Sequence, residues 1–227
     1  MSHLPDDTNW AVSECAEAER GDVRRTQRLV ELAHVLAQHP TAALPAACGD
    51  GAMLKAASRC FDNDAIAPQD VLLRHSEATY SRLSEVPLVL AAQDTTEVDW
   101  TAPPAPQGLG LLGPPACQGL LVQSTLAFTP ERLPVGLLAQ QVWARDPDDV
   151  GTRARRTQRP SSQKESQKWL TSLEAVVSAH AECPQPYVVP IGDREAEVDA
   201  LLTAVRPAGV ALLLRAAWDR GVRAPER

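Results

Sequence analysis

The sequence predicts an α+β protein in which a helical N-terminal half precedes a mixed β-sheet. Up to about residue 84, apolar side chains recur at the spacing of amphipathic helices. From Pro87 onward they form short runs separated by glycines and prolines, as in an antiparallel meander. Further along, such runs alternate with helical segments, which is typical of a partly parallel sheet. We therefore expect two domains, residues 1–84 and 85–227.

The helical half contains four expected helices. The first covers residues 10–19. The second starts after the N-cap candidate Asp22, and the third and fourth cover residues 51–61 and 68–86. Three strands are then expected in "PLVLAAQDTT", "GLLVQSTLAFT" and "PVGLLAQQVWA", with a long Pro- and Gly-rich loop over residues 101–118. The helix "SQKESQKWLTSLEAVVSAHA", the strand "YVVPIGD", the helix "EAEVDALLTAV" and the strand "GVALLLRAA" complete the pattern. Three antiparallel strands followed by αβ units is the order of ribonuclease-H-like folds.

Composition excludes several classes of protein. The chain has 227 residues, of which 44% are hydrophobic, enough for one large or two small domains. No apolar run approaches the roughly 20 residues of a membrane span, and the start "MSHLPDDTNW" lacks the features of a secretory signal, so we expect a cytoplasmic protein. The five scattered cysteines suggest neither a disulfide framework nor a zinc site. A net charge of −7 confines any nucleic-acid contact to local basic patches.

Two such patches occur. Arg24, Arg25 and Arg28 fall in the first turns of the second expected helix. A basic loop over residues 153–168 has six positive charges against the single acid Glu165; the six are Arg153, Arg155, Arg156, Arg159, Lys164 and Lys168. Each patch is either a solvated charged surface or a phosphate contact. Because the sign of the loop opposes the net charge, phosphate contact gains some weight there, whereas a solvated face is the commoner role for a basic helix start such as the first patch.

Two aspartates end apolar runs in the predicted sheet. Asp94 follows "LVLAAQ" and Asp193 follows "YVVPIG", almost half the chain apart. If these strands are neighbours, the two carboxylates lie close together and call for a cation such as Mg²⁺ or Mn²⁺. Such a pair suits two-metal phosphoryl transfer. Taken singly, an aspartate at such a position is more often a strand-end cap or turn former.

A series of motifs resembles one family across nearly the whole chain, from Gly21 to Val222. They are "GDVRRTQRLVELAHVLAQHP", "KAASRCFDND", "QDTTEVDWT", "GLLVQSTLAFTP", "KESQKWL" and "IGDREAEVDALL". Their order is similar to that of bacterial cut-and-paste transposases of the Tn-five type, in the insertion-sequence-four group. The resemblance implies a helical domain that binds transposon-end DNA and a ribonuclease-H-like core with a DDE metal triad. It also implies double-stranded DNA as partner and a location at the bacterial nucleoid.

The same resemblance assigns roles to residues. Asp94 of "QDTT" matches the first acid of the triad and Asp193 of "GDREAE" the second, so both are expected to be catalytic and to bind Mg²⁺ or Mn²⁺. Arg24, Arg25 and Arg28 match the family's DNA-contacting helix. The family's third acid lies in a Tyr, Arg, Glu, Lys signature that this sequence lacks, and Glu226 in the charged tail is not assigned to its role.

Three hypotheses follow. The first is a transposase whose core is truncated before the third acid, and which by itself cleaves DNA poorly with Mg²⁺ or Mn²⁺; robust cleavage lost on Asp94→Ala would contradict it. The second is a non-enzymatic DNA-binding or inhibitory remnant that occupies transposon ends or pairs with a full-length transposase or a second copy. The third, an aspartyl-phosphate Mg²⁺ phosphatase, is disfavoured because Thr96 stands where its second acid is needed.

Overall fold

The computed structural model describes residues 9–15, 23–100, 106–113, 117–145, 165–219 and 221. The chain divides into two compact units, residues 1–79 and 80–227. Their boundary lies inside helix α5 (Pro68–Leu83), a few residues before the predicted boundary at 84 and 85. The assignment of a catalytic role to the second unit stays a prediction. No helix within the described ranges is long and apolar enough to cross a membrane.

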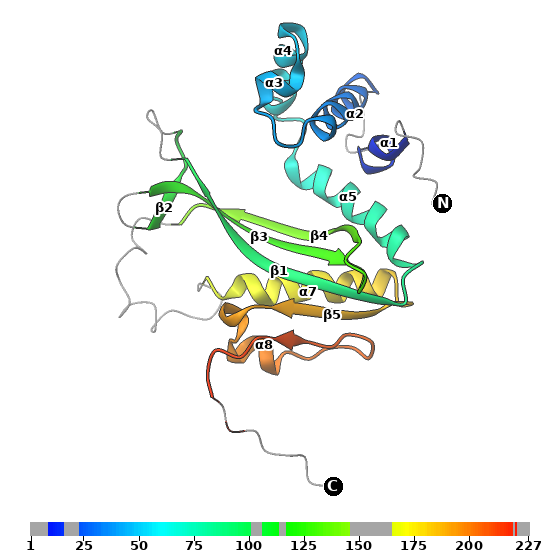
Figure 1. Ribbon diagram of the computed structural model, residues 1–227, viewed down its shortest axis with the longest axis vertical. Helices are drawn as coiled ribbons and strands as arrows, with labels where there is room; N and C mark the ends of the chain where they lie inside the picture. The colour runs from blue at the N-terminus through cyan, green and yellow to red at the C-terminus, as the bar shows by residue number, and fades with distance from the viewer. Residues whose placement is uncertain are drawn as a thin grey trace. The chain divides into compact units, whose positions relative to one another are not determined.

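The first unit is helical, as predicted (Figure 1). It comprises the start of α5 and four further helices, namely α1 (Asn9–Cys15), α2 (Val23–Gln38), α3 (Leu44–Cys48) and α4 (Gly51–Phe61). The sequence did not reveal α3, because a helix of five residues is too short to show a period. The expected end of the first helix lies outside the described residues, and so does Asp22, the predicted N-cap of the second helix.

Short-range contacts fix the ends of these helices and join them. The Oδ1 atom of Asp50 accepts a hydrogen bond from the Met53 N–H at 2.7 Å and so caps α4. His75 on α5 lies 2.5 Å from Glu14 on α1. The core of the unit is formed by residues from α2, α3 and α4, which are Leu32, Cys48, Ala57 and Cys60. Helices α2 and α4 are therefore held against each other by buried side chains.

The second unit is built on one mixed sheet (Figure 1). Its strands are β1 (Leu88–Asp99), β2 (Gly110–Gly113), β3 (Cys117–Phe128), β4 (Pro134–Trp143), β5 (Tyr187–Gly192) and β6 (Leu213–Leu214). The strands β1, β3 and β4 form the predicted antiparallel meander. On the other side of β1, the strands β5 and β6 run parallel to it. The order across the sheet is therefore β4-β3-β1-β5-β6, with β2 also paired to β3.

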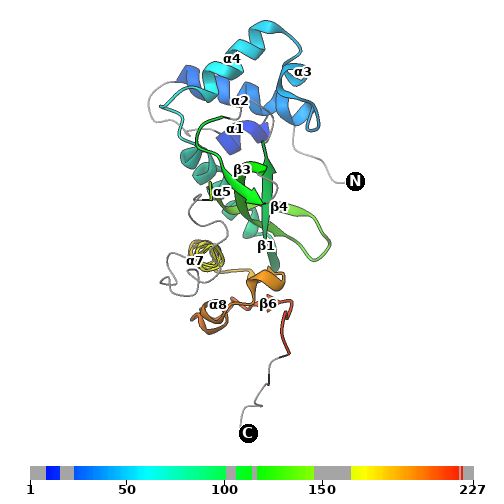
Figure 2. The same cartoon turned by 90° about the vertical axis from the view of Figure 1, so that its left-hand side faces the viewer.

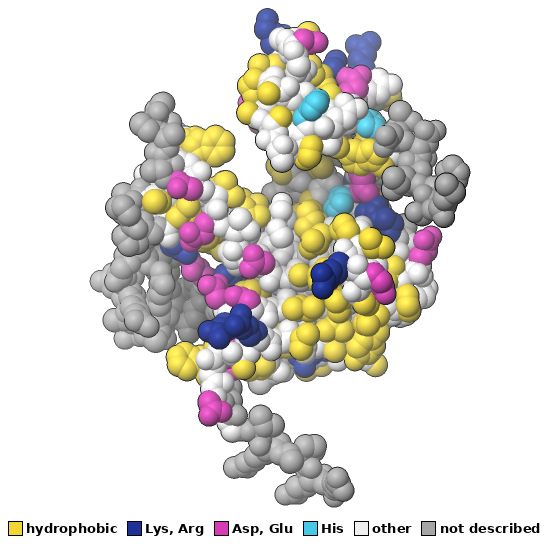
Figure 3. Space-filling model, in the orientation of Figure 1, with side chains coloured by type: hydrophobic (Ala, Val, Ile, Leu, Met, Phe, Trp, Pro, Cys, Tyr) yellow, Lys and Arg dark blue, Asp and Glu magenta, His cyan; other side chains and the backbone are white. Residues whose placement is uncertain are grey.

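Helix α7 (Gln167–Glu182) covers one face of this sheet, and Figure 2 shows it nearly end-on beside the strands. Its residues Trp169, Leu173 and Val176 are buried in a core with Val89 and Val188 from the strands. The opposite face is more open, and Figure 3 shows hydrophobic side chains gathered over it. The two faces therefore differ in how completely they are covered.

The predicted elements differ from the structure in three places. The expected loop over residues 101–118 contains β2, whose Gly110 comes so close to the Arg145 backbone that a Cβ there would lie 2.3 Å from its nitrogen. The expected helix over 195–205 is interrupted by the extended backbone of Val198 into a 3₁₀ turn, η3 (Arg194–Ala196), and a short helix, α8 (Asp199–Thr203). The last expected strand is reduced to β6. Neither a close backbone approach nor a short extended break has a periodicity that the sequence reveals.

Candidate functional sites

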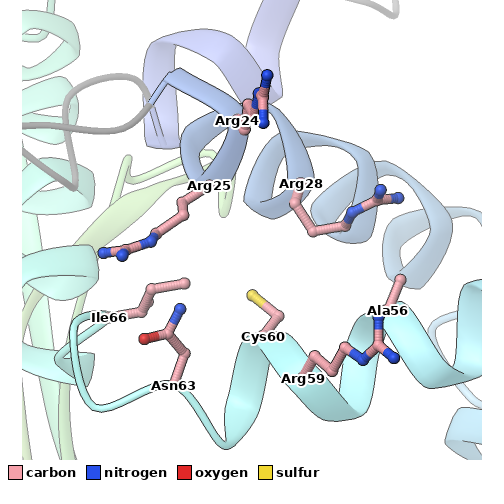
Figure 4. A pocket seen from close by; sticks show the side chains of 8 residues that line it. All are labelled: Arg24, Arg25, Arg28, Ala56, Arg59, Cys60, Asn63 and Ile66. Carbon is pink, nitrogen blue, oxygen red and sulfur yellow. The ribbon is translucent and has the colours of Figure 1, made fainter.

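A pocket of about 250 Å³ lies between α2 and α4 in the first unit (Figure 4). We call it the arginine pocket, because four of the eight residues that line it are arginines. Its lining consists of Arg24, Arg25, Arg28, Ala56, Arg59, Cys60, Asn63 and Ile66. None of these eight residues is acidic, so the lining has a net positive charge.

The helical pattern explains why these arginines face outward together. On α2, Leu29, Leu32 and Leu36 recur at helical spacing and pack into the core, which leaves the arginines of the first turns at the surface. On α4, Ala57 and Cys60 are buried, and Arg59 lies between them in sequence and is exposed. Packing of the two apolar faces therefore brings basic side chains of both helices to one pocket.

Arg28 shows how the charges of the pocket are balanced. Its guanidinium lies 2.6 Å from the Glu31 carboxylate, one helical turn along, and both side chains are about half exposed. An exposed pair of this kind contributes little stability and exchanges partners easily. Burial raises the pKa of the Cys60 thiol, and the charge of Arg28 acts in the opposite direction. The positive charge of Arg28 therefore acts on Cys60, which also lines the pocket.

The sequence predicted three of the four arginines and missed Arg59. It belongs to another helix and has no basic neighbour in sequence closer than Lys55, one turn before it. The spacing of Lys55 and Arg59 was a weak signal of a basic helix face. The predicted basic loop cannot be compared, because Arg153, Arg155, Arg156 and Arg159 lie outside the described residues.

The second candidate site concerns the two aspartates. The prediction that Asp94 ends its strand is wrong, since β1 continues to Asp99 through its pairing with β3. The parallel pairing of β1 with β5, however, ends at Gln93 and Gly192. Asp94 is the next residue of β1 and Asp193 directly follows the last residue of β5, and neighbouring strands lie about 4.8 Å apart. The sheet therefore brings these two distant residues to adjacent positions.

Asp94 lies on the more open face of the sheet. Its neighbour Thr95 pairs with Gln123, which in turn pairs with Gln141, and the Nε2 atom of Gln141 donates to the Lys168 carbonyl of α7 at 3.0 Å. These residues therefore define the face that α7 covers. Because side chains alternate along a strand, Asp94 points to the other face, where its cross-strand partner is Ser124.

Asp193 is held at the start of the turn after β5. Its Oδ1 atom accepts a hydrogen bond from the Glu195 N–H at 2.9 Å, which leaves its second carboxylate oxygen outside this bond. The Glu195 carboxylate lies 3.4 Å from the Lys168 ammonium. The Glu197 carboxylate accepts hydrogen bonds from the backbone N–H groups of Ala217 and Trp218. Within the described parts of the chain, no group of three or more His, Cys, Asp or Glu side chains is placed to hold a metal.

Comparison with known families bears on the first unit. Residues 7–66 match the family model described as Transposase DNA-binding. The match covers α1 to α4 and therefore all eight residues of the arginine pocket. The first unit thus contains a transposase DNA-binding domain.

Proposed function

We propose that this chain binds double-stranded DNA at transposon ends, and that α2 of the first unit carries the main contact. The observation that carries the proposal is the match of residues 7–66 to a transposase DNA-binding domain. The arginine pocket supports it, because this region is basic in a chain whose net charge is −7. Arginine is well suited to phosphate, since its planar guanidinium donates two parallel hydrogen bonds.

We further propose that the second unit is a ribonuclease-H-like core of the Tn-five type, in which Asp94 and Asp193 bind Mg²⁺ or Mn²⁺. The strand order and the adjacent positions of the two aspartates support this proposal. The donor set fits the metal, because Mg²⁺ is commonly bound by one or two carboxylates and fills its other positions with waters and substrate phosphates. The hydrogen bond from Glu195 orients one oxygen of Asp193 and leaves the other for a ligand.

In this proposal each part of the chain has a separate task. The α2 arginines bind and orient the DNA, and the paired carboxylates hold divalent cations at the reacting phosphate. A bound metal would supply the activation of water or a DNA hydroxyl and the stabilisation of the leaving oxygen. Lys168, whose side chain is 11% exposed, pairs with Glu195, two residues after Asp193.

Titration of a fluorescent duplex carrying a transposon end tests the DNA-binding proposal. The wild-type chain should bind with an affinity that falls steeply with salt, since each neutralised phosphate contributes a slope of about 0.9 in log–log form. Alanine at Arg24, Arg25 and Arg28 together should reduce that slope by about 2 to 3. An unchanged slope would remove α2 from the interface.

A further inference from the structure

We propose that the arginine pocket is a clamp for one backbone phosphate of DNA, and that Arg59 of α4 closes it opposite α2. This proposal rests on the proposed DNA-binding function. It adds a binding site for the phosphate and two further residues that contact it, Arg59 and Asn63. The sequence alone assigned no role to either residue. Both line the pocket, and both come from the end of α4 or from the turn that follows it.

The arrangement of the side chains favours a small anion held from two sides. In Figure 4, Arg28 and Arg59 lie toward the same end of the gap on facing helices, while Arg25 lies at the other end near Asn63. Guanidinium groups on two separate helices can bind different oxygens of one phosphate. A clamp of this type differs from a flat basic helix face, which contacts phosphates from one side only.

Asn63 is oriented for this task by its own turn. Its Oδ1 atom accepts a hydrogen bond from the Ala65 N–H at 3.0 Å. This bond fixes the amide group, and Figure 4 shows the nitrogen directed toward the gap. The Nδ2 group is a hydrogen-bond donor only, so it suits an acceptor such as a phosphate oxygen.

The floor of the pocket strengthens these contacts. It is formed by Ala56, Cys60 and Ile66, of which Cys60 is buried and the other two are half-buried. Apolar surface on one side of a charge pair reduces the screening by water and makes the electrostatic attraction stronger than at a fully exposed site. A volume of about 250 Å³ admits a phosphate group with part of its ester chain.

The test compares Arg59→Ala with Lys55→Ala in the full chain. Both residues are exposed on α4, both changes remove one positive charge, and only Arg59 lines the pocket. We expect Arg59→Ala to weaken duplex binding by about tenfold and to lower the salt slope by about 0.9, since it removes one charged phosphate contact. Lys55→Ala should change the affinity by less than about threefold. Arg59→Lys should keep the slope and recover part of the affinity.

A second measurement does not depend on DNA. Inorganic pyrophosphate, titrated by calorimetry, should bind the wild-type chain and the Lys55→Ala variant and should bind Arg59→Ala several-fold more weakly. Circular dichroism melting curves establish that each variant is folded. Equal effects of Arg59→Ala and Lys55→Ala in a chain that binds DNA would overturn the clamp and leave the proposed function intact. Pyrophosphate binding that depends on Arg59 in a chain that does not bind DNA would support a phosphate site in the pocket, but it would overturn both the assignment of that site to DNA and the proposed function.

Discussion

The arginine pocket and the aspartate pair are both clusters of like charge, but the chain assembles them differently. The pocket takes its charges from α2 and α4, which are close in sequence and pack directly on each other. The pair takes one carboxylate from β1 and one from the end of β5, and only the sheet brings them together. Like charges that are held close repel one another unless a counter-ion is bound. In our proposals the first cluster therefore binds an anion and the second a cation, in units that can be tested separately.

The largest expected effect is a loss of stability in the second unit that leaves DNA binding by the first unit unchanged. Trp169 is 2% exposed in the core of the second unit, and truncation to alanine should lower the free energy of unfolding of that unit by about 3–5 kcal/mol. Urea denaturation measures this loss. DNA binding by the first unit should change by less than about twofold, since its own core lies in α2 to α4.

Trp218→Ala is the control for this experiment, because that side chain is 71% exposed and the hydrogen bond to Glu197 comes from the backbone N–H, which alanine keeps. It should leave both stability and DNA binding nearly unchanged. A parallel loss of DNA affinity and stability in Trp169→Ala would show that the two clusters are not independent.

The next effect concerns the cation. At a concentration ten times its dissociation constant, Mn²⁺ should stabilise the second unit by about 1.4 kcal/mol, which thermal melting detects. Asp94→Asn and Asp193→Asn should each abolish the stabilisation, and asparagine at 193 retains an oxygen for the Glu195 N–H. Glu97→Gln, on the same strand and also exposed, should keep it. Stabilisation that survives both aspartate substitutions would refute this metal site.

The next prediction concerns how the stability of the first unit depends on pH. Burial raises the pKa of the Cys15 and Cys60 thiols above the ordinary value of 9.0, so the folded state favours the protonated form. The resulting stability is present below about pH 9 and is lost as the pH rises through the folded-state pKa values. Urea midpoints measured between about pH 8 and pH 10 should therefore fall. The fall should be smaller when both cysteines are replaced by alanine, and an equal fall would exclude the thiols as its cause.

The smallest effect tests the competition for Arg28. Glu31→Gln removes the carboxylate that pairs with Arg28 at 2.6 Å, and should strengthen DNA binding by about two- to threefold, which corresponds to a weak exposed ion pair. Glu77→Gln is the matched control, because it breaks the Arg74–Glu77 pair, which has the same spacing but lies outside the pocket. A similar gain in both variants would indicate a general charge effect rather than release of Arg28.

Local patterns predicted most of the helices and strands. The predicted helix over 51–61 coincides with α4, because its N-cap Asp50 and its apolar spacing are both encoded within a few residues. The strands β1, β3, β4 and β5 appear close to their expected positions for the same reason. The arginines Arg24, Arg25 and Arg28 were also recognisable, since they fall within one helical turn of each other.

Other features depended on contacts between elements. Arg59 joins the pocket only because α4 packs against α2, and its own neighbours in sequence do not mark it. Asp94 was placed at a strand end because polar residues follow it, whereas pairing with β3 extends the strand to Asp99. Pairing partners are chosen across the sheet, so neither result is contained in a local window.

By itself, the sequence determined the order of helices and strands, the basic start of α2 and the chemical character of both aspartates, because spacing, capping and charge are local properties. The tertiary structure decided that Arg59 and Asn63 face α2. It also decided that Asp94 and Asp193 lie side by side, where the pairing of β1 with β5 ends. Helix packing and strand register set these distances, and both depend on residues far apart in the chain. A charge becomes part of a binding site only when the fold has placed its partners beside it.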